Sequence, residues 1–174
     1  MKRLLLLRHA KAVPAEPGID DHERALLKRG CEDAPRLGRY IERSGYAPEF
    51  IVSSTSKRTV ETVELVTDEL TGSRRIDYIE ALYLAEPELI LSIVRLAPDT
   101  MKSLMVVGHN PGLEQLATLL TREPVKRKER DRFDAIEEKF PTCALAVLDF
   151  EVARWRDIVA GQGALKDFVR PRDL

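Results

Sequence analysis

The sequence of 174 residues is poor in cysteine and has no long apolar run. Its two cysteines, Cys31 and Cys143, lie far apart and form no metal-ligand or redox pattern. We therefore expect no disulfide framework and a reducing, cytoplasmic location. The apolar run at residues 4–7 ends at Arg8, which makes it too short for a signal peptide or a membrane span.

Charge of one sign is also lacking. The 28 basic and 29 acidic residues leave a net charge of -1 at pH 7, which gives no overall attraction for nucleic acid or an anionic membrane. Neither is expected as a partner, so any attraction for an anion must be local. The length suits one domain over residues 1–174, and the chain shows no internal repeat and no linker.

Strand-like and helix-like segments alternate along the chain, which predicts a layered α/β fold. Helices are expected at about 31–44 and 56–70, from Pro87, and after Asn110 and Pro111, which suit the N-cap and first helical position; strands are expected at 75–79, 144–150 and 155–160. The last two strands are expected to be neighbours. The loop after the first apolar run is rich in proline, glycine and aspartate and is long enough to overhang a site.

Three short apolar runs, at residues 4–7, 50–52 and 104–107, are typical of strands buried on both faces. Side chains suited to phosphate follow these runs: Arg8 and His9 after the first, Arg58 after the second and His109 after the third. In open α/β sheets, ligands bind at the carboxyl ends of the strands. If the three strands are neighbours, the four side chains share one pocket.

Arg58 occupies an unfavourable place in its expected helix. It lies near the N-terminus, where a cation opposes the helix dipole at a cost of roughly 0.3 to 1 kcal/mol. A local rule that is broken without local gain often marks a functional site. The alternative is an ion pair with Glu61, one helical turn further on.

Together these motifs resemble the histidine phosphatase superfamily, also called the phosphoglycerate-mutase-like family, and more narrowly the short SixA-like phosphohistidine phosphatases. The segments that carry the resemblance are Arg8-His9-Ala10-Lys11, Ser53-Ser54 with Lys57-Arg58-Thr59, Gly108-His109-Asn110-Pro111, and Phe140-Pro141-Thr142. The resemblance implies a three-layer α/β/α sandwich with a mostly parallel central sheet. It also implies a phosphatase that uses no metal and no other cofactor.

The residue types fit phosphoryl transfer. A neutral imidazole at His9 can attack phosphorus and form a phosphohistidine intermediate. Arg8 and Arg58 suit the nonbridging oxygens, and their positive charges also favour the neutral nucleophile by lowering its pKa. His109 would donate a hydrogen bond to the same oxygens.

Further residues have a functional and a structural interpretation. Asn110 contacts phosphate or only caps its helix, while Lys11 and Ser53 line the pocket or serve as solvated and capping side chains. Glu80 is the candidate proton donor for an alcohol leaving group, because relatives often place an acid after a strand in this part of the chain. Glu86 as the donor, or a surface role for Glu80, stays open. A phosphohistidine imidazole leaves readily and needs the acid less.

Two charged stretches imitate binding sites. His22 stands among acidic residues, but no second histidine has ligand spacing to it, which favours an exposed loop over a metal site. Residues 126–132 are rich in Lys and Arg, lack interleaved aromatics and contain acids, which favours a solvated loop over a nucleic-acid site. If functional, this basic stretch would help to dock an acidic protein substrate.

We therefore expect a SixA-like phosphatase that acts through phospho-His9 on a phosphorylated substrate, with a phosphohistidine-bearing protein as the expected partner. The short chain leaves little room for the insertions with which larger relatives grip small substrates. One alternative is a phosphatase or mutase for small phosphorylated metabolites with the same machinery. Another is a non-catalytic phosphate-binding module, which the presence of both His9 and His109 disfavours.

Overall fold

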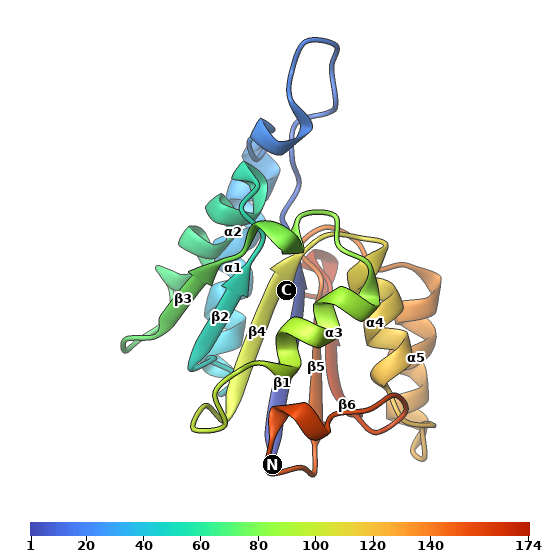
Figure 1. Ribbon diagram of the computed structural model, residues 1–174. Coiled ribbons are helices and arrows are strands. Elements are labelled where there is room, and N and C mark those ends of the chain that lie inside the picture. The colour runs from blue at the N-terminus through green and yellow to red at the C-terminus, as the bar shows by residue number, and fades with distance from the viewer.

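One six-stranded sheet, in the order β3-β2-β4-β1-β5-β6, forms the centre of the computed structural model, which describes residues 1–174 (Figure 1). The strands are β1 (Lys2–Arg8), β2 (Phe50–Ser53), β3 (Arg75–Tyr78), β4 (Ser103–Gly108), β5 (Leu145–Phe150) and β6 (Ala164–Val169). The first four in this order run parallel, whereas β5 runs antiparallel to β1 and β6. The expected mostly parallel sheet is confirmed.

Helices cover both faces of the sheet (Figure 1). α1 (Lys28–Arg43) and α2 (Lys57–Thr67) pack against each other in one layer, and α3 (Pro87–Arg95), α4 (Gly112–Leu120) and α5 (Arg127–Glu138) form the other. The expected three-layer α/β/α sandwich is therefore confirmed. None of these helices combines the length and the apolar content needed to cross a bilayer.

The leucine run of β1 explains why this strand lies at the centre of the molecule. Successive side chains of a strand point to opposite faces. Accordingly, Leu4 and Leu6 join the core beneath α3, α4 and α5, while Leu5 and Leu7 join the core beneath α1 and α2. All four are fully buried. Burial of each leucine side chain stabilises the fold by about 1.5 to 3 kcal/mol. The four leucines therefore hold β1, and with it Arg8 and His9 at its carboxyl end, in a fixed position.

Several predicted boundaries hold and others shift. α2 begins at Lys57 after the Ser56 cap, β3 lies within the predicted strand at 75–79, and Pro87 is the first residue of α3, as expected. α1 begins at Lys28, earlier than expected. Gly30 lies in its first turn, where the absence of a side chain lets the helix pack against the backbone of Lys11. A Cβ atom at Gly30 would lie 2.3 Å from the Lys11 carbonyl oxygen.

The predicted strand at 155–160 is wrong. Trp155–Asp157 forms a short 3-10 helix, and the strand that pairs with β5 is β6, further along the chain. Trp155 is fully buried, and its indole Nε1 donates to the Met101 carbonyl at 2.8 Å. Trp155, Ile158 and Val159 are residue types common in strands, but Trp155 and Ile158 both pack into the core at a spacing of three, which suits a helical turn.

The prediction of a solvated loop at residues 126–132 is also wrong, because most of this stretch lies in α5. Phe133 and Ile136, one helical turn apart, pack on the core beneath α5 and hold the helix in place. The basic side chains before them remain largely exposed on its first turns. The solvated character predicted from the charge pattern is confirmed, whereas the helix itself depends on the apolar pair Phe133 and Ile136.

Candidate active site

The order of the strands brings the predicted phosphate-binding side chains together. β2, β4 and β1 are neighbours, and their register sets Arg8 opposite Gly108 and Ser53 opposite Val107. The chain continues from β1 toward β2 and from β4 toward β5, in opposite directions across the sheet, which creates a crevice between the two strands. The rings of His9 and His109 meet there, with centroids 5.3 Å apart.

His9 is held with one ring nitrogen free. Its side chain is almost completely buried, and Nδ1 lies 2.8 Å from the Ala10 carbonyl oxygen. Because a carbonyl oxygen only accepts hydrogen bonds, Nδ1 carries the proton and Nε2 keeps its lone pair. Burial lowers the pKa of His9 to about 4, and the charges of Arg58 and Arg8 act in the same direction against the opposing Ala10 hydrogen bond. The imidazole is therefore neutral at pH 7.

His109 is buried and uses both ring nitrogens. Nε2 lies 2.9 Å from the Ser54 hydroxyl oxygen, and Nδ1 lies 3.4 Å from Nη2 of Arg58. A guanidinium only donates, so Nδ1 accepts and Nε2–H donates to Ser54. Burial lowers the pKa of His109 to about 3, helped by His9 and Arg58. Ser54 is a contact residue that the sequence reasoning missed, although it stands within the Ser53-Ser54 motif.

Arg58 is fixed by Asp21 from the loop after β1. Nη1 donates to the Asp21 carbonyl at 2.7 Å, and Nη2 donates to the Asp21 carboxylate at 3.1 Å. Nε–H of Arg58 is buried and has no partner. The alternative ion pair with Glu61 is wrong, because Glu61 instead accepts from the Leu26 backbone N–H at 3.3 Å.

The short 3-10 helix at Asp21–Glu23, here called the lip, closes over Arg58. The Tyr83 hydroxyl donates to the Asp21 carboxylate; this bond and those from Arg58 lower the pKa of Asp21 to about 2. The expectation that His22 is simply an exposed loop residue is wrong. Its Nε2 lies 2.9 Å from the Thr55 hydroxyl oxygen, and its ring meets the edge of Tyr83 at a centroid distance of 4.9 Å.

Arg8 and Asn110 meet at one backbone carbonyl. Nη1 of Arg8 donates to the Phe140 carbonyl oxygen at 3.1 Å, and Nδ2 of Asn110 donates to the same oxygen at 2.8 Å. Nε–H of Arg8 is buried without a partner. The prediction of Asn110 as an N-cap is wrong, since α4 begins at Gly112 with Pro111 in the cap position. Nδ2 of Asn110 also donates to the Glu114 carboxylate of α4 at 3.3 Å, so this side chain links α4 to Phe140 without capping the helix.

The remaining candidates lie at the margins of this cluster. Ser53 is fully buried and donates to the Ser54 carbonyl at 2.9 Å. Lys11 is exposed and lines a neighbouring cleft. Glu80 and Glu86 are exposed after β3, and neither carboxylate hydrogen-bonds to the four central side chains. No three His, Cys, Asp or Glu side chains are grouped so as to hold a metal ion.

Comparison with known proteins assigns the chain to a family. Residues 4–83 match the profile described as Histidine phosphatase superfamily (branch 1). A relative from Mycobacterium tuberculosis, itself uncharacterised, is 32% identical over 166 residues, which cover 95% of this chain and 100% of that protein. This chain belongs to the histidine phosphatase superfamily.

Solved structures place it near the SixA branch of that superfamily. A structure from Agrobacterium tumefaciens, proposed to be the phosphohistidine phosphatase SixA, is 33% identical, with a TM-score of 0.79 and 98% of each chain covered. An Escherichia coli structure proposed to be an α-ribazole-5'-phosphate phosphatase shares the fold at 17% identity, a TM-score of 0.62, and 95% and 96% coverage of this chain and that chain. The SixA-like resemblance predicted from the motifs is confirmed.

Proposed function

We propose that this SixA-like protein is a phosphatase that transfers a phosphoryl group from its substrate to Nε2 of His9 and then to water. The observation that carries the proposal is the hydrogen bond from Nδ1 of His9 to the Ala10 carbonyl. This bond fixes the tautomer and leaves the Nε2 lone pair available in a site where burial and two arginines keep the ring neutral.

In the first step, the Nε2 lone pair forms the nitrogen–phosphorus bond while the bond from phosphorus to the leaving group breaks. The leaving group takes a proton as it departs. In the second step, water supplies a hydroxyl group to phosphorus, its other proton passes to solvent, and the electron pair of the nitrogen–phosphorus bond returns to Nε2. Inorganic phosphate and neutral His9 result.

Arg8 and Arg58 are assigned to the nonbridging oxygens of the phosphoryl group. Each has a buried Nε–H without a partner, and leaving such a donor unpaired costs about 1 to 3 kcal/mol. A phosphoryl oxygen would accept these hydrogen bonds and offset that cost. We assign His109 to the same oxygens through its Nε2–H, which donates to the Ser54 hydroxyl oxygen in this structure. Asn110 borders the site beside Arg8 and has a lesser, orienting part.

The substrate we propose is a protein that carries phosphohistidine. The Agrobacterium structure supports this class, and so does the exposed Glu80 carboxylate, which forms no hydrogen bond with the four central side chains. An imidazole leaving group departs with little help from an acid. The second candidate is a small phosphomonoester, favoured by the place of Glu80 directly after β3, at the sheet edge where an alcohol leaving group would need a proton.

Trapping of the intermediate tests the proposal. The protein is incubated with a radiolabelled phosphohistidine protein, with para-nitrophenyl phosphate, and with a panel of sugar phosphates and phosphoglycerates, then quenched and analysed for label and released phosphate. We expect label on the native protein and none on His9→Ala, together with a loss of turnover of at least about a thousandfold. His22→Ala, which removes a ring from the lip instead, is the control and should still be labelled. Label or substantial turnover in His9→Ala would disprove the covalent mechanism.

A further inference from the structure

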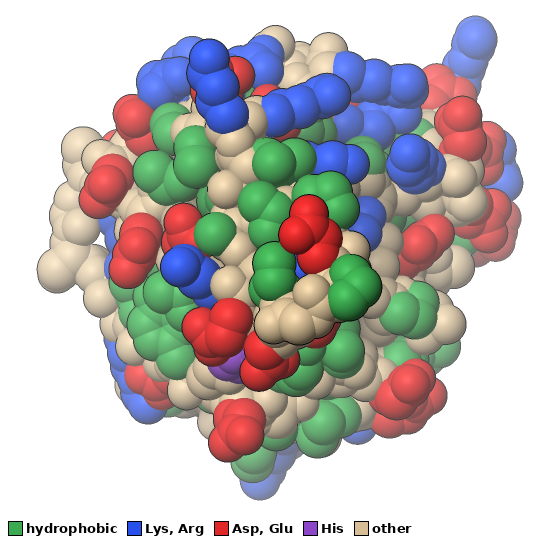
Figure 2. Space-filling view, turned by 90° about the horizontal axis from the view of Figure 1, so that it is seen from above, with side chains coloured by type: hydrophobic (Ala, Val, Ile, Leu, Met, Phe, Trp, Pro, Cys, Tyr) green, Lys and Arg blue, Asp and Glu red, His purple; other side chains and the backbone are tan.

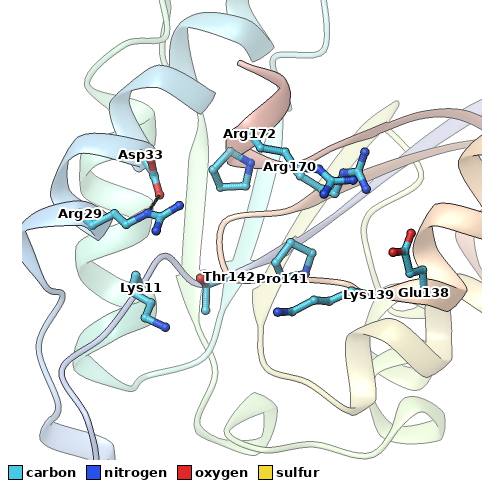
Figure 3. A pocket seen from close by; sticks show the side chains of 10 residues that line it. Lys11, Arg29, Asp33, Glu138, Lys139, Pro141, Thr142, Arg170 and Arg172 are labelled. Carbon is cyan, nitrogen blue, oxygen red and sulfur yellow. Dashed lines mark ion pairs between the residues drawn. The ribbon is translucent and has the colours of Figure 1, made fainter.

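A cationic cleft of about 280 Å³ lies beside the active site and has no part in the mechanism above. Its lining contains five cationic side chains, Lys11, Arg29, Lys139, Arg170 and Arg172, and only two carboxylates (Figure 3). The chain as a whole carries a net charge of -1, so this surplus of positive charge is local. Seen onto the carboxyl-end edge of the sheet, Lys and Arg side chains gather along one side of the molecule (Figure 2).

Three of the five cations have no carboxylate partner. Arg170 is neutralised by Asp173, with Nε 3.0 Å from the carboxylate, and Arg29 lies 3.7 Å from Asp33. Lys11, Lys139 and Arg172 take part in none of the ion pairs of the structure, and all three are exposed.

Lys11 and Arg29 lie on one side of Thr142 and Lys139 lies on the other (Figure 3). Of these three, Lys11 and Lys139 are unpaired, and unpaired cations on opposite sides of a concave surface concentrate the electric field and attract an anion.

The cleft shares a wall with the active site. The segment at residues 140–143 offers the Phe140 carbonyl to Arg8, and its Cys143 N–H contacts the carbonyls of Arg8 and His9 at 3.1 and 3.0 Å. Thr142, which lies between Phe140 and Cys143 in the chain, lines the cleft.

Lys11 follows His9 so closely that their Cα atoms are at most about 7 Å apart. The Lys11 backbone is also held in place, because its carbonyl accepts from the Leu27 N–H at 2.9 Å. One molecule can therefore contact both the active site and the cleft.

We propose that this cleft is an anion-binding subsite, which holds a carboxylate or phosphate group that the substrate carries in addition to the phosphoryl group attacked by His9. The inference rests on the proposed function, because it takes the two anions to belong to one substrate. Lys11, Lys139 and Arg172 supply the attraction. Arg29 and Arg170, already paired with carboxylates, form the rim.

The test uses two pairs of matched probes. The first pair is phenyl phosphates that bear an alkyl carboxylate, or its neutral amide, on chains of increasing length; the second is phosphohistidine peptides with Asp or Asn near the phosphohistidine. We expect kcat/KM for the charged member to exceed that for the neutral member about tenfold at the best spacing, the effect of about two partly exposed ion pairs. The preference should shrink at high salt. Preference within the first pair assigns the anion to a small phosphoester, and within the second pair to a protein.

The variant Lys139→Gln with Arg172→Gln should bring this ratio close to one. The control, Lys126→Gln with Lys128→Gln, removes the same charge from exposed positions at the opposite end of α5 and should keep the ratio. A ratio near one for both pairs in the native protein, or a ratio that the cleft variant leaves unchanged, would overturn the subsite.

Calorimetric titration with the same probes requires no turnover. If tighter binding of the charged probes depends on Lys139 and Arg172 while His9 is never labelled, the proposed function fails and the anion site stands. If His9 is labelled but the charged probes bind no better than the neutral ones, the subsite fails and the proposed function stands.

Discussion

The two faces of the segment at residues 140–143 present opposite ways of handling an anion. On one face, His9, Arg58 and His109 are at most 7% exposed, and burial sets their chemistry by keeping both imidazoles neutral. On the other face, the cleft cations are solvated, with 74% of the Arg29 side chain exposed. Solvated cations attract the anionic groups of a substrate and favour substrates that carry them. Because solvent screens their charge, they have little influence on the protonation state or reactivity of neighbouring side chains. Reactivity therefore belongs to the buried face and preference among substrates to the open one.

The largest effect that sharpens this comparison is expected from Arg58. Arg58→Ala should lower kcat for every substrate by about a hundredfold, because it removes a buried donor aimed at the transferring phosphoryl group. The loss should be equal for good and poor leaving groups. Arg39→Ala, which removes an exposed arginine of α1, is the matched control and should leave kcat within about twofold of the native value. A loss for Arg58→Ala confined to KM would mean that Arg58 only attracts the substrate.

The buried face should also reveal itself in the pH dependence of stability. Burial lowers the pKa of His9 to about 4 and of His109 to about 3, whereas both return to about 6.5 in the unfolded chain. Below pH 6.5 the unfolded chain therefore binds protons that the folded protein does not. Stability should fall as the pH drops from about 6.5 toward 4, by up to about 1.4 kcal/mol per pH unit for each histidine.

Urea unfolding at a series of pH values measures this slope. In His9→Gln one of the two contributions is absent, so the slope between pH 6 and pH 5 should be about half of the native slope. The cleft variant Lys139→Gln with Arg172→Gln should keep the native slope, because it leaves both buried histidines in place. An unchanged slope in His9→Gln would show that His9 is protonated in the folded protein.

A smaller effect is expected from Asp21, which we regard as a positioning residue for Arg58. Asp21→Asn keeps the carbonyl contact to Nη1 and weakens the carboxylate contact to Nη2. It should lower kcat by about tenfold with little change in KM, because a loosely held guanidinium is less well aligned in the transition state. In an Arg58→Ala background the same change should have no further effect. Additive losses would assign Asp21 a function of its own.

The sequence predicted the buried face far better than its surroundings. The leucine run before Arg8 and the apolar run before His109 announce buried strands, and a parallel sheet brings their ends together. The lip carries no such pattern. Asp21 reaches residues 37 and 62 positions away, Arg58 and Tyr83, and no local periodicity encodes a contact of that kind.

Similar reasons explain the other errors. Asn110 has the composition of an N-cap, but its amide is drawn to the Phe140 carbonyl, 30 positions away in the chain. Trp155 is a residue type common in strands, but its ring fills the core from a short helical turn and its indole bonds the Met101 carbonyl. In each case a long-range contact overrides a local preference, and only the folded chain reveals it.

The effect confined to the fewest substrates is expected from Glu80 at the exposed margin. If Glu80 protonates the leaving group, Glu80→Gln should slow an alkyl phosphate by at least about tenfold and leave para-nitrophenyl phosphate and phosphohistidine nearly unaffected, because their leaving groups depart with less help. Glu86→Gln is the matched control, an exposed carboxylate nearby in the chain. An equal loss across the three substrates would indicate a structural role for Glu80. A selective loss in Glu86→Gln alone would transfer the role of proton donor to Glu86. In either case the proton for an alcohol leaving group would come from an exposed carboxylate at the margin of the site, and not from the buried side chains.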